Sequence, residues 1–128
     1  MRETLLTIAL IFSLANVHAQ GEEAKLKISH LIGDFYIYTT YNQYEGNRIP
    51  ANGMYVITSS GVVMFDTPWD TTQLQPLLDS IKWRHHKSVI MCIATHWHSD
   101  RTEGLAFYQQ QGISTYTTIL TDELSKKN

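Results

Sequence analysis

Residues 89–100 read Val-Ile-Met-Cys-Ile-Ala-Thr-His-Trp-His-Ser-Asp, an apolar run that ends in two imidazoles and a carboxylate. The apolar run predicts a buried strand over residues 88–95. Alternate residues of an extended chain project to the same side, so we expect His96, His98 and Asp100 to converge where the strand opens into a loop. Zinc readily accepts imidazole nitrogen and carboxylate oxygen as ligands. The pattern indicates a metal site, and the alternative is a polar loop with two solvated histidines.

The sequence before this segment predicts four short strands and a connector. The strands are expected from alternating polarity and from β-branched and aromatic residues, over residues 26–30, 34–40, 54–58 and 62–66. The last two flank Ser59-Ser60-Gly61 and predict a hairpin. Residues 41–50 are rich in turn formers and are expected to form a loop that connects two strands.

Helices are expected on both sides of the metal-binding pattern. Leucine and isoleucine recur at helical spacing from Leu74 to Ile81 and predict a helix over about residues 71–86. We interpret His85 and His86, at its end, as surface residues rather than ligands. A short helix is expected over residues 104–111, a strand over 113–118, and a last helix with Thr121 as its N-cap. Helices must cover at least one face of a mixed sheet, so the fold class expected is α+β.

The first nineteen residues have the pattern of a secretory signal peptide. Arg2 supplies a positive charge, residues 5–15 are almost all apolar, and Val17-His18-Ala19 places small residues before a cleavage site. The alternative is a buried N-terminal helix. The pattern predicts an exported protein without a membrane anchor, cut after Ala19, with residues 20–128 forming part of a single domain.

Composition excludes several classes of protein. A formal net charge of −2 gives no electrostatic case for nucleic-acid binding. The single cysteine, Cys92, rules out an intramolecular disulfide framework. Since Cys92 lies inside the apolar run, we interpret it as a core residue rather than a nucleophile or ligand. The chain also lacks a G-x-S-x-G elbow, an S-x-x-K motif, a P-loop and a GxGxxG motif.

The pattern His-x-His-x-Asp followed by Arg101-Thr102-Glu103-Gly104-Leu105 resembles the metallo-β-lactamase superfamily. Residues 36–41, 51–55 and 61–69 resemble the N-terminal half of the class B β-lactamases, most of all the di-zinc, broad-spectrum subclass of flavobacterial type. The resemblance implies the N-terminal half of an αβ/βα sandwich, with helices on one face of a mixed sheet. If the other face is uncovered, Phe35, Ile37, Val62 and Met64 are expected to be partly exposed, depending on the face each takes.

The resemblance also implies roles for individual residues around two zinc ions. His96 and His98 are similar to ligands of the first zinc, and Asp100 to the carboxylate of the second, where it also counts as a catalytic residue. Asp66 resembles the strand-end aspartate that supports the metal-binding loop. Arg101 resembles a residue beneath the second zinc, and the alternative for it is a surface ion pair.

Two aromatic residues are implied to contact the substrate. Residues 41–51 match the position of the family's mobile flap, where Tyr44 would be the apolar contact. Trp69 would wall the substrate cleft. The alternatives are an exposed loop aromatic for Tyr44 and core packing for Trp69.

The implied activity is zinc-dependent hydrolysis of the β-lactam amide bond by metal-bound hydroxide, in a monomeric periplasmic enzyme that acts on small molecules. The alternatives are a thioesterase of the glyoxalase type and a non-catalytic, truncated remnant. In the family, a third histidine of the first site and a cysteine and a histidine of the second lie further along the chain. No histidine follows His98 here, and no cysteine follows Cys92. We therefore expect the sequence to lack the C-terminal half of the domain, either as a fragment of a longer protein or as a truncated product.

Overall fold

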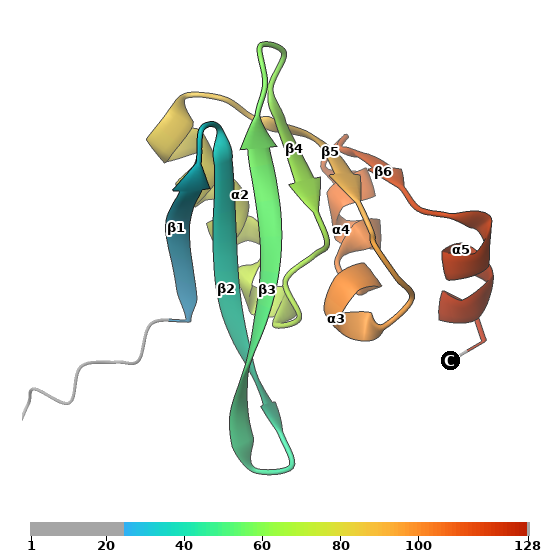
Figure 1. Cartoon of the computed structure of the whole chain (residues 1–128). Coiled ribbons are helices and arrows are strands. Elements are labelled where there is room, and N and C mark those ends of the chain that lie inside the picture. Colours follow the sequence, from blue (N-terminus) through green and yellow to red (C-terminus); the bar gives the residue numbers. More distant parts are fainter. Residues whose placement is uncertain (1–24, 128) are drawn as a thin grey trace, which may run out of the picture.

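One mixed six-stranded sheet organises the chain in the computed structural model of the protein, which describes residues 25–127 (Figure 1). The strands lie in sequence order across the sheet: β1 (Leu26–Ile32), β2 (Phe35–Tyr44), β3 (Asn47–Ile57), β4 (Val62–Phe65), β5 (Val89–Ile93) and β6 (Ser114–Tyr116). Pairing is antiparallel from β1 to β4 and parallel from β4 to β6. The expected α+β class, the mixed sheet and the hairpin of β3 and β4 are confirmed.

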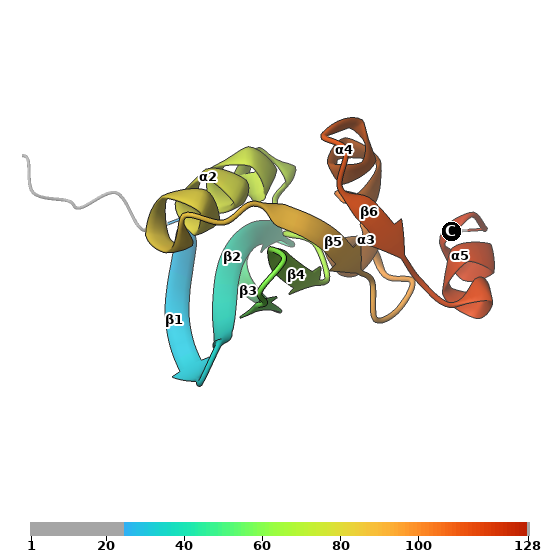
Figure 2. The same ribbon diagram turned by 90° about the horizontal axis from the view of Figure 1, so that it is seen from above.

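The helices are short and follow the strands: η1 (Thr71–Gln73), α2 (Leu74–His85), α3 (Ser99–Thr102), α4 (Leu105–Gln110) and α5 (Ile119–Ser125). Figure 2 shows α2 and α4 on the same face of the sheet, while α5 lies beyond β6. Within residues 25–127, no helix combines the length and the apolar character needed to cross a membrane.

The core lies between the sheet and α2. This helix buries Leu74, Leu77 and Ile81, the positions at which the spacing predicted an apolar face. They pack into one cluster with sheet residues that include Tyr38, Tyr55, Val62, Met64 and Cys92. Cys92 is fully buried, as expected, and burial raises the pKa of its thiol to about 12.

The loop predicted over residues 41–50 is wrong. The strands β2 and β3 stay paired out to Tyr44 and Asn47, and the turn between them consists of Glu45 and Gly46 alone. Both turn residues have positive φ angles, 49° and 77°, as a two-residue hairpin of type I′ requires. This arm extends past the end of the sheet (Figure 1). Since neither face of the arm covers the core, its polar and apolar residues do not alternate as in a half-buried strand.

Two further expectations need correction. Thr118, not Thr121, is the N-cap of α5: the Thr118 hydroxyl accepts a hydrogen bond from the Thr121 backbone N–H at 3.1 Å, and Thr121 is buried in the first turn. His85 is half-buried rather than a surface residue. Its ring packs on Tyr36 and lies 3.0 Å from the Tyr55 hydroxyl. Burial, and then the charges of its neighbours in sequence, lower the pKa of His85.

The second face of the sheet is apolar and is not covered by any described helix. Phe35 and Ile37 lie on this face, 39% exposed and half-buried respectively. Val62 and Met64 were also expected to be exposed, but they are fully buried under the helices. Because side chains alternate along β4, its uncovered residues are Val63 and Phe65 instead.

Candidate metal centre

The candidate site forms where β4 and β5 end side by side. The two strands are parallel, with Phe65 opposite Ile93, so their carboxyl ends meet at the same edge of the sheet. The Asp66 backbone N–H donates to the Ile93 carbonyl at 2.9 Å and continues the pairing by one residue. In mixed and parallel sheets, the loops that leave such carboxyl ends commonly carry the functional side chains. The segment from His96 to Asp100 is one of these loops.

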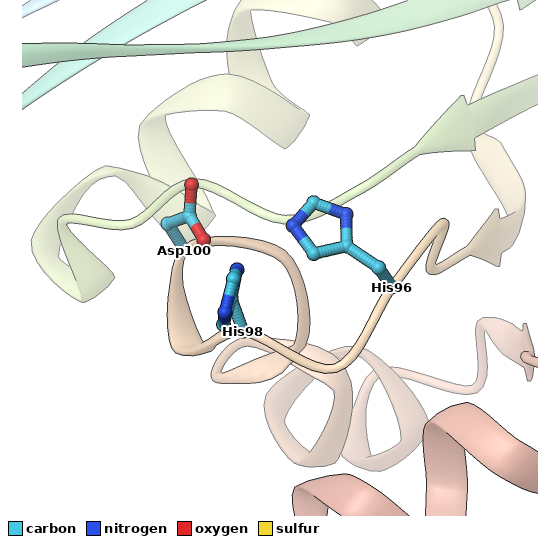
Figure 3. A group of neighbouring side chains, drawn as sticks. All are labelled: His96, His98 and Asp100. Atoms are coloured by element: carbon cyan, nitrogen blue, oxygen red, sulfur yellow. The ribbon is translucent and has the colours of Figure 1, made fainter.

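His96, His98 and Asp100 come together as the sequence predicted. Each offers one ligand atom, and these atoms lie within 4.8 Å of one another. Figure 3 shows a ring nitrogen of His96 pointing toward His98 and Asp100. The two imidazole rings are nearly perpendicular, with centroids 5.0 Å apart. His98 is exposed, and the other two side chains are half-buried.

The backbone that brings the three together differs from the expected extended segment. Of the residues from His96 to Asp100, only His96, Trp97 and His98 lie outside a helix, and His98 is the N-cap of α3. Asp100 lies in the first turn of α3, where Ser99 and Asp100 favour a helix start and negative charge suits the helix dipole. The Thr102 hydroxyl donates to the His98 carbonyl at 3.1 Å and closes the turn. The prediction of convergence is correct, but a helical turn produces it.

Asp66 connects the end of β4 to the first histidine. Its carboxylate accepts hydrogen bonds from the Thr95 backbone N–H and from the Thr95 hydroxyl, both at 2.8 Å. The Thr95 oxygen also lies 3.1 Å from Nδ1 of His96. Because a carboxylate only accepts, the Thr95 hydroxyl donates to Asp66 and its oxygen accepts from an Nδ1–H of His96. This arrangement leaves Nε2 of His96 with a free lone pair for a metal.

Arg101 joins three parts of the site. Its Nε lies 3.9 Å from a carboxylate oxygen of Asp66, and its guanidinium approaches Asp100 to 3.4 Å. The same guanidinium donates to the Asn52 carbonyl of β3. Nε is buried and makes no hydrogen bond within residues 25–127. Arg101 is therefore a half-buried residue that links the carboxylates of Asp66 and Asp100 to β3.

A cavity of about 550 Å³ opens beside the candidate ligands. It is lined by Tyr44, Trp69, Trp97, His98, Ser99, Asp100, Thr102 and Ser125. The rings of Tyr44 and Trp69 lie next to each other with centroids 6.2 Å apart, so the hairpin arm and the residues after β4 form one wall. The sequence did not single out Trp97, although a large aromatic residue between two histidines is a usable signal. Nothing in the sequence pointed to Ser125.

The chemistry of the three donors fits a metal such as zinc. Zinc binds imidazole nitrogen and carboxylate oxygen at about 2.0–2.2 Å, so the ligand atoms of one ion lie at most ~4 Å apart. The measured spread of up to 4.8 Å requires a small side-chain rotation to share one ion, and exposed His98 has room for it. The spread also leaves open an arrangement in which Asp100 binds a second ion.

The sequence of the chain is similar to those of known metallo-β-lactamases. The chain is 40% identical to a type 2 metallo-β-lactamase of Elizabethkingia meningoseptica over its whole length and 52% of that relative. It is 44% identical to metallo-β-lactamase IND-1 of Chryseobacterium indologenes over 74% of the chain and 40% of the relative. No protein-family model matches the chain.

The fold is similar to those of solved metallo-β-lactamases. The crystal structure of metallo-β-lactamase IND-7 superposes with a TM-score of 0.78 at 41% identity, covering 83% of this chain and 49% of that one. The mono-zinc form of FIM-1 from Pseudomonas aeruginosa gives a TM-score of 0.78 at 25% identity, covering 86% of this chain and 49% of that one. The chain spans about half the length of the relatives it matches. In sequence and in fold, this chain is similar to the N-terminal part of metallo-β-lactamases.

Proposed function

We propose that this chain is the N-terminal part of a zinc-dependent β-lactamase, in which His96 and His98 hold one zinc ion and Asp100 a second. The observation that carries the proposal is the convergence of these three donors, two of which, His98 and Asp100, line the cavity. The names of the relatives and the mono-zinc form of FIM-1 support the metal and the reaction class. Zinc in such a site supplies hydroxide near neutral pH and polarises the lactam carbonyl.

The residues of this chain would prepare the site before any substrate arrives. Asp66 and Thr95 orient His96, and Arg101 holds Asp66 and Asp100 at their observed separation. Outer contacts of this kind fix the direction of a ligand's lone pair. The guanidinium of Arg101 also offsets the negative charge of the two carboxylates when no metal is bound.

The cavity walls would bind the β-lactam. Tyr44, Trp69 and Trp97 line the cavity with flat apolar surfaces beside the candidate metal ligands His98 and Asp100. Aromatic walls with a few polar groups at one end are typical of small-molecule sites. We propose that these rings position the lactam and exclude water, whereas the chemistry depends on the metal ligands.

The experiment uses the complete protein. Treatment with a chelator should abolish nitrocefin hydrolysis, and added zinc should restore it, because the reacting water depends on the metal. His98→Ala should lower kcat/KM by at least 100-fold. The matched control is His86→Asn, which changes an exposed histidine in a left-handed backbone position that asparagine tolerates. Full activity after exhaustive chelation would reject the metal-dependent mechanism.

We also propose that residues 1–19 direct export and are removed, which would place the enzyme in the periplasm. These residues lie outside the part of the chain that the structure describes. The support is their sequence pattern alone. The intact mass of the protein recovered from the periplasm should match a chain that begins at Gln20, and a mass that retains Met1 would contradict the proposal.

A further inference from the structure

Tyr38 is a fully buried tyrosine whose hydroxyl reaches the metal-binding end of the sheet. Its side chain is 1% exposed, and its hydroxyl donates to the Asp66 carbonyl at 2.8 Å. The Phe65 carbonyl lies 3.3 Å from the same oxygen. The hydroxyl therefore contacts the backbone at the point where β4 ends and the site begins.

A glycine on the neighbouring strand makes room for this ring. Gly53 of β3 is paired with Tyr38 across the two strands. A Cβ atom placed on Gly53 would lie 2.1 Å from both Cζ and the hydroxyl oxygen of Tyr38. No side chain larger than hydrogen is compatible with the ring in this position. Gly53 and Tyr38 thus form a matched pair.

The carbonyl to which the Tyr38 hydroxyl donates belongs to Asp66, a residue with a strained backbone. Asp66 has a φ of 68°, in the left-handed region that residues with a Cβ rarely adopt. Its carbonyl accepts from Tyr38 and, at 3.4 Å, from the weaker donor Cys92 Sγ. Without the hydroxyl, the Asp66 carbonyl would keep only the thiol as a donor, and the Thr67 N–H of the same peptide group, which donates to the Arg101 carbonyl at 3.1 Å, would be the main remaining restraint on a relaxation of Asp66 toward a common φ. Such a rotation would carry its carboxylate away from Thr95.

We propose that Tyr38, seated over Gly53, is a positioning residue for the metal centre: through Asp66 and Thr95, it sets the tautomer and the ring orientation of His96. Each step of the path is a hydrogen bond: from the Tyr38 hydroxyl to the Asp66 carbonyl, from the Thr95 hydroxyl to the Asp66 carboxylate, and between the Thr95 oxygen and Nδ1 of His96. The inference rests on the proposed metal site and deepens it.

The hydroxyl is suited to act as a permanent donor. Desolvation by burial, followed by the nearby Tyr108, Cys92 and Asp66, raises the pKa of Tyr38 well above its usual value. The proton stays on the oxygen over the whole range in which such an enzyme works. Tyr38 therefore acts on the site through geometry.

The test compares three tyrosine-to-phenylalanine variants of the complete protein. Tyr38→Phe removes the donor and keeps the ring. Tyr55→Phe removes a hydroxyl that bonds His85, away from the site. Tyr108→Phe removes a buried hydroxyl that has no hydrogen-bond partner among the residues that the structure describes. We expect Tyr38→Phe to lower zinc affinity about 10-fold, in competition with a chromophoric chelator, and both controls to stay within about twofold.

A second readout needs no metal. In the metal-free protein, nitrogen-15 NMR of the imidazoles should show His96 protonated at Nδ1 in the parent and in both controls. In Tyr38→Phe, it should show a mixture of the two tautomers. Gly53→Ala should shift zinc affinity and the His96 tautomer in the same direction, because the added Cβ displaces the ring while the hydroxyl is retained.

The possible outcomes separate the two proposals. If the parent protein binds no zinc, the proposed function fails, whatever the variants do. If the parent binds zinc and Tyr38→Phe matches its affinity and its His96 tautomer, the role of Tyr38 is overturned. An equal loss of affinity in Tyr55→Phe would also overturn that role, since a general loss of stability would then explain both.

Discussion

Asp66 is the residue on which the candidate site depends most. It is buried, its backbone is left-handed, and its carboxylate and carbonyl face different partners. From the sequence, its role came from the family resemblance alone, because a strand-end aspartate has no periodic signal. Thr95 and Tyr38 were not singled out, since each looks like an ordinary strand residue until the fold places it beside Asp66.

Thr95 offers a prediction at this scale. Thr95→Val keeps the shape of the side chain and removes the hydroxyl between Asp66 and His96. Zinc affinity should fall about 10-fold, because Nδ1 of His96 loses its acceptor. Thr95→Ser restores the hydroxyl and should recover most of the affinity. Calorimetric zinc titration of the two variants measures the difference, and equal affinities would show that the hydroxyl has no such role.

Cys92 predicts how stability depends on alkaline pH. The pKa of its thiol is raised from 9.0 to about 12 because burial disfavours the thiolate. The unfolded chain therefore releases this proton near pH 9, while the folded chain keeps it. The thiol makes its full contribution to the free energy of unfolding below pH 9. This contribution falls as the pH rises from 9 toward 12, by roughly 1–2 kcal/mol at pH 10.5.

Urea unfolding of the complete protein at pH 7.5 and 10.5 measures the effect, and Cys92→Ala is the control. The variant should lose stability between the two pH values less steeply than the parent. Identical pH dependence of the two proteins would mean that the thiol titrates alike in both states. Tyr55, whose pKa is raised to about 12, also by burial, contributes in the same direction in both proteins.

At the scale of elements, the sequence predictions are most accurate for the helices and strands that contribute to the core. The helix α2 and the strands β4 and β5 were predicted within a few residues because they bury an apolar face, as Leu77, Ile81 and Cys92 show. The hairpin arm was missed because its strands leave the core and lose alternation. The turn at Glu45 and Gly46 carries its own signal, a glycine at a left-handed position, which the many polar neighbours obscured.

The hairpin arm of β2 and β3 leads to a prediction about substrate binding. Tyr44 lies next to the Glu45–Gly46 turn of the arm, and its ring contacts Trp69 in the wall of the cavity. Tyr44→Ala should raise KM for a bulky β-lactam several-fold and leave kcat within about twofold, if the arm supplies binding that is equal in the ground and transition states. The control is Asn47→Ala, which changes the exposed residue paired with Tyr44 but not lining the cavity. Steady-state kinetics with an unchanged KM would remove Tyr44 from the substrate site.

At the scale of the whole molecule, the two faces of the sheet are unequal. One face carries α2 and α4 and a fully buried core (Figure 2). The other presents half-buried apolar residues from neighbouring strands: Ile37, Met54, Val56, Val63, Phe65, Met91 and Ile93. In the edge strand β6 and in α5, Tyr116, Ile119 and Leu120 are 55%, 81% and 63% exposed. An apolar area of this extent marks a surface that packs against something else.

This asymmetry predicts how residues 20–128 behave when they are expressed alone. With one apolar face open and three candidate metal ligands in place, neither packing nor zinc binding supplies the stability of a finished domain. We expect this segment to aggregate or to form a loosely packed state that binds a hydrophobic dye, shows weak near-ultraviolet circular dichroism and unfolds without a sharp transition. Nitrocefin turnover should be absent with zinc in excess. A monomer that melts cooperatively and hydrolyses nitrocefin would show that the uncovered face does not limit folding, and that the three ligands described here suffice for the reaction.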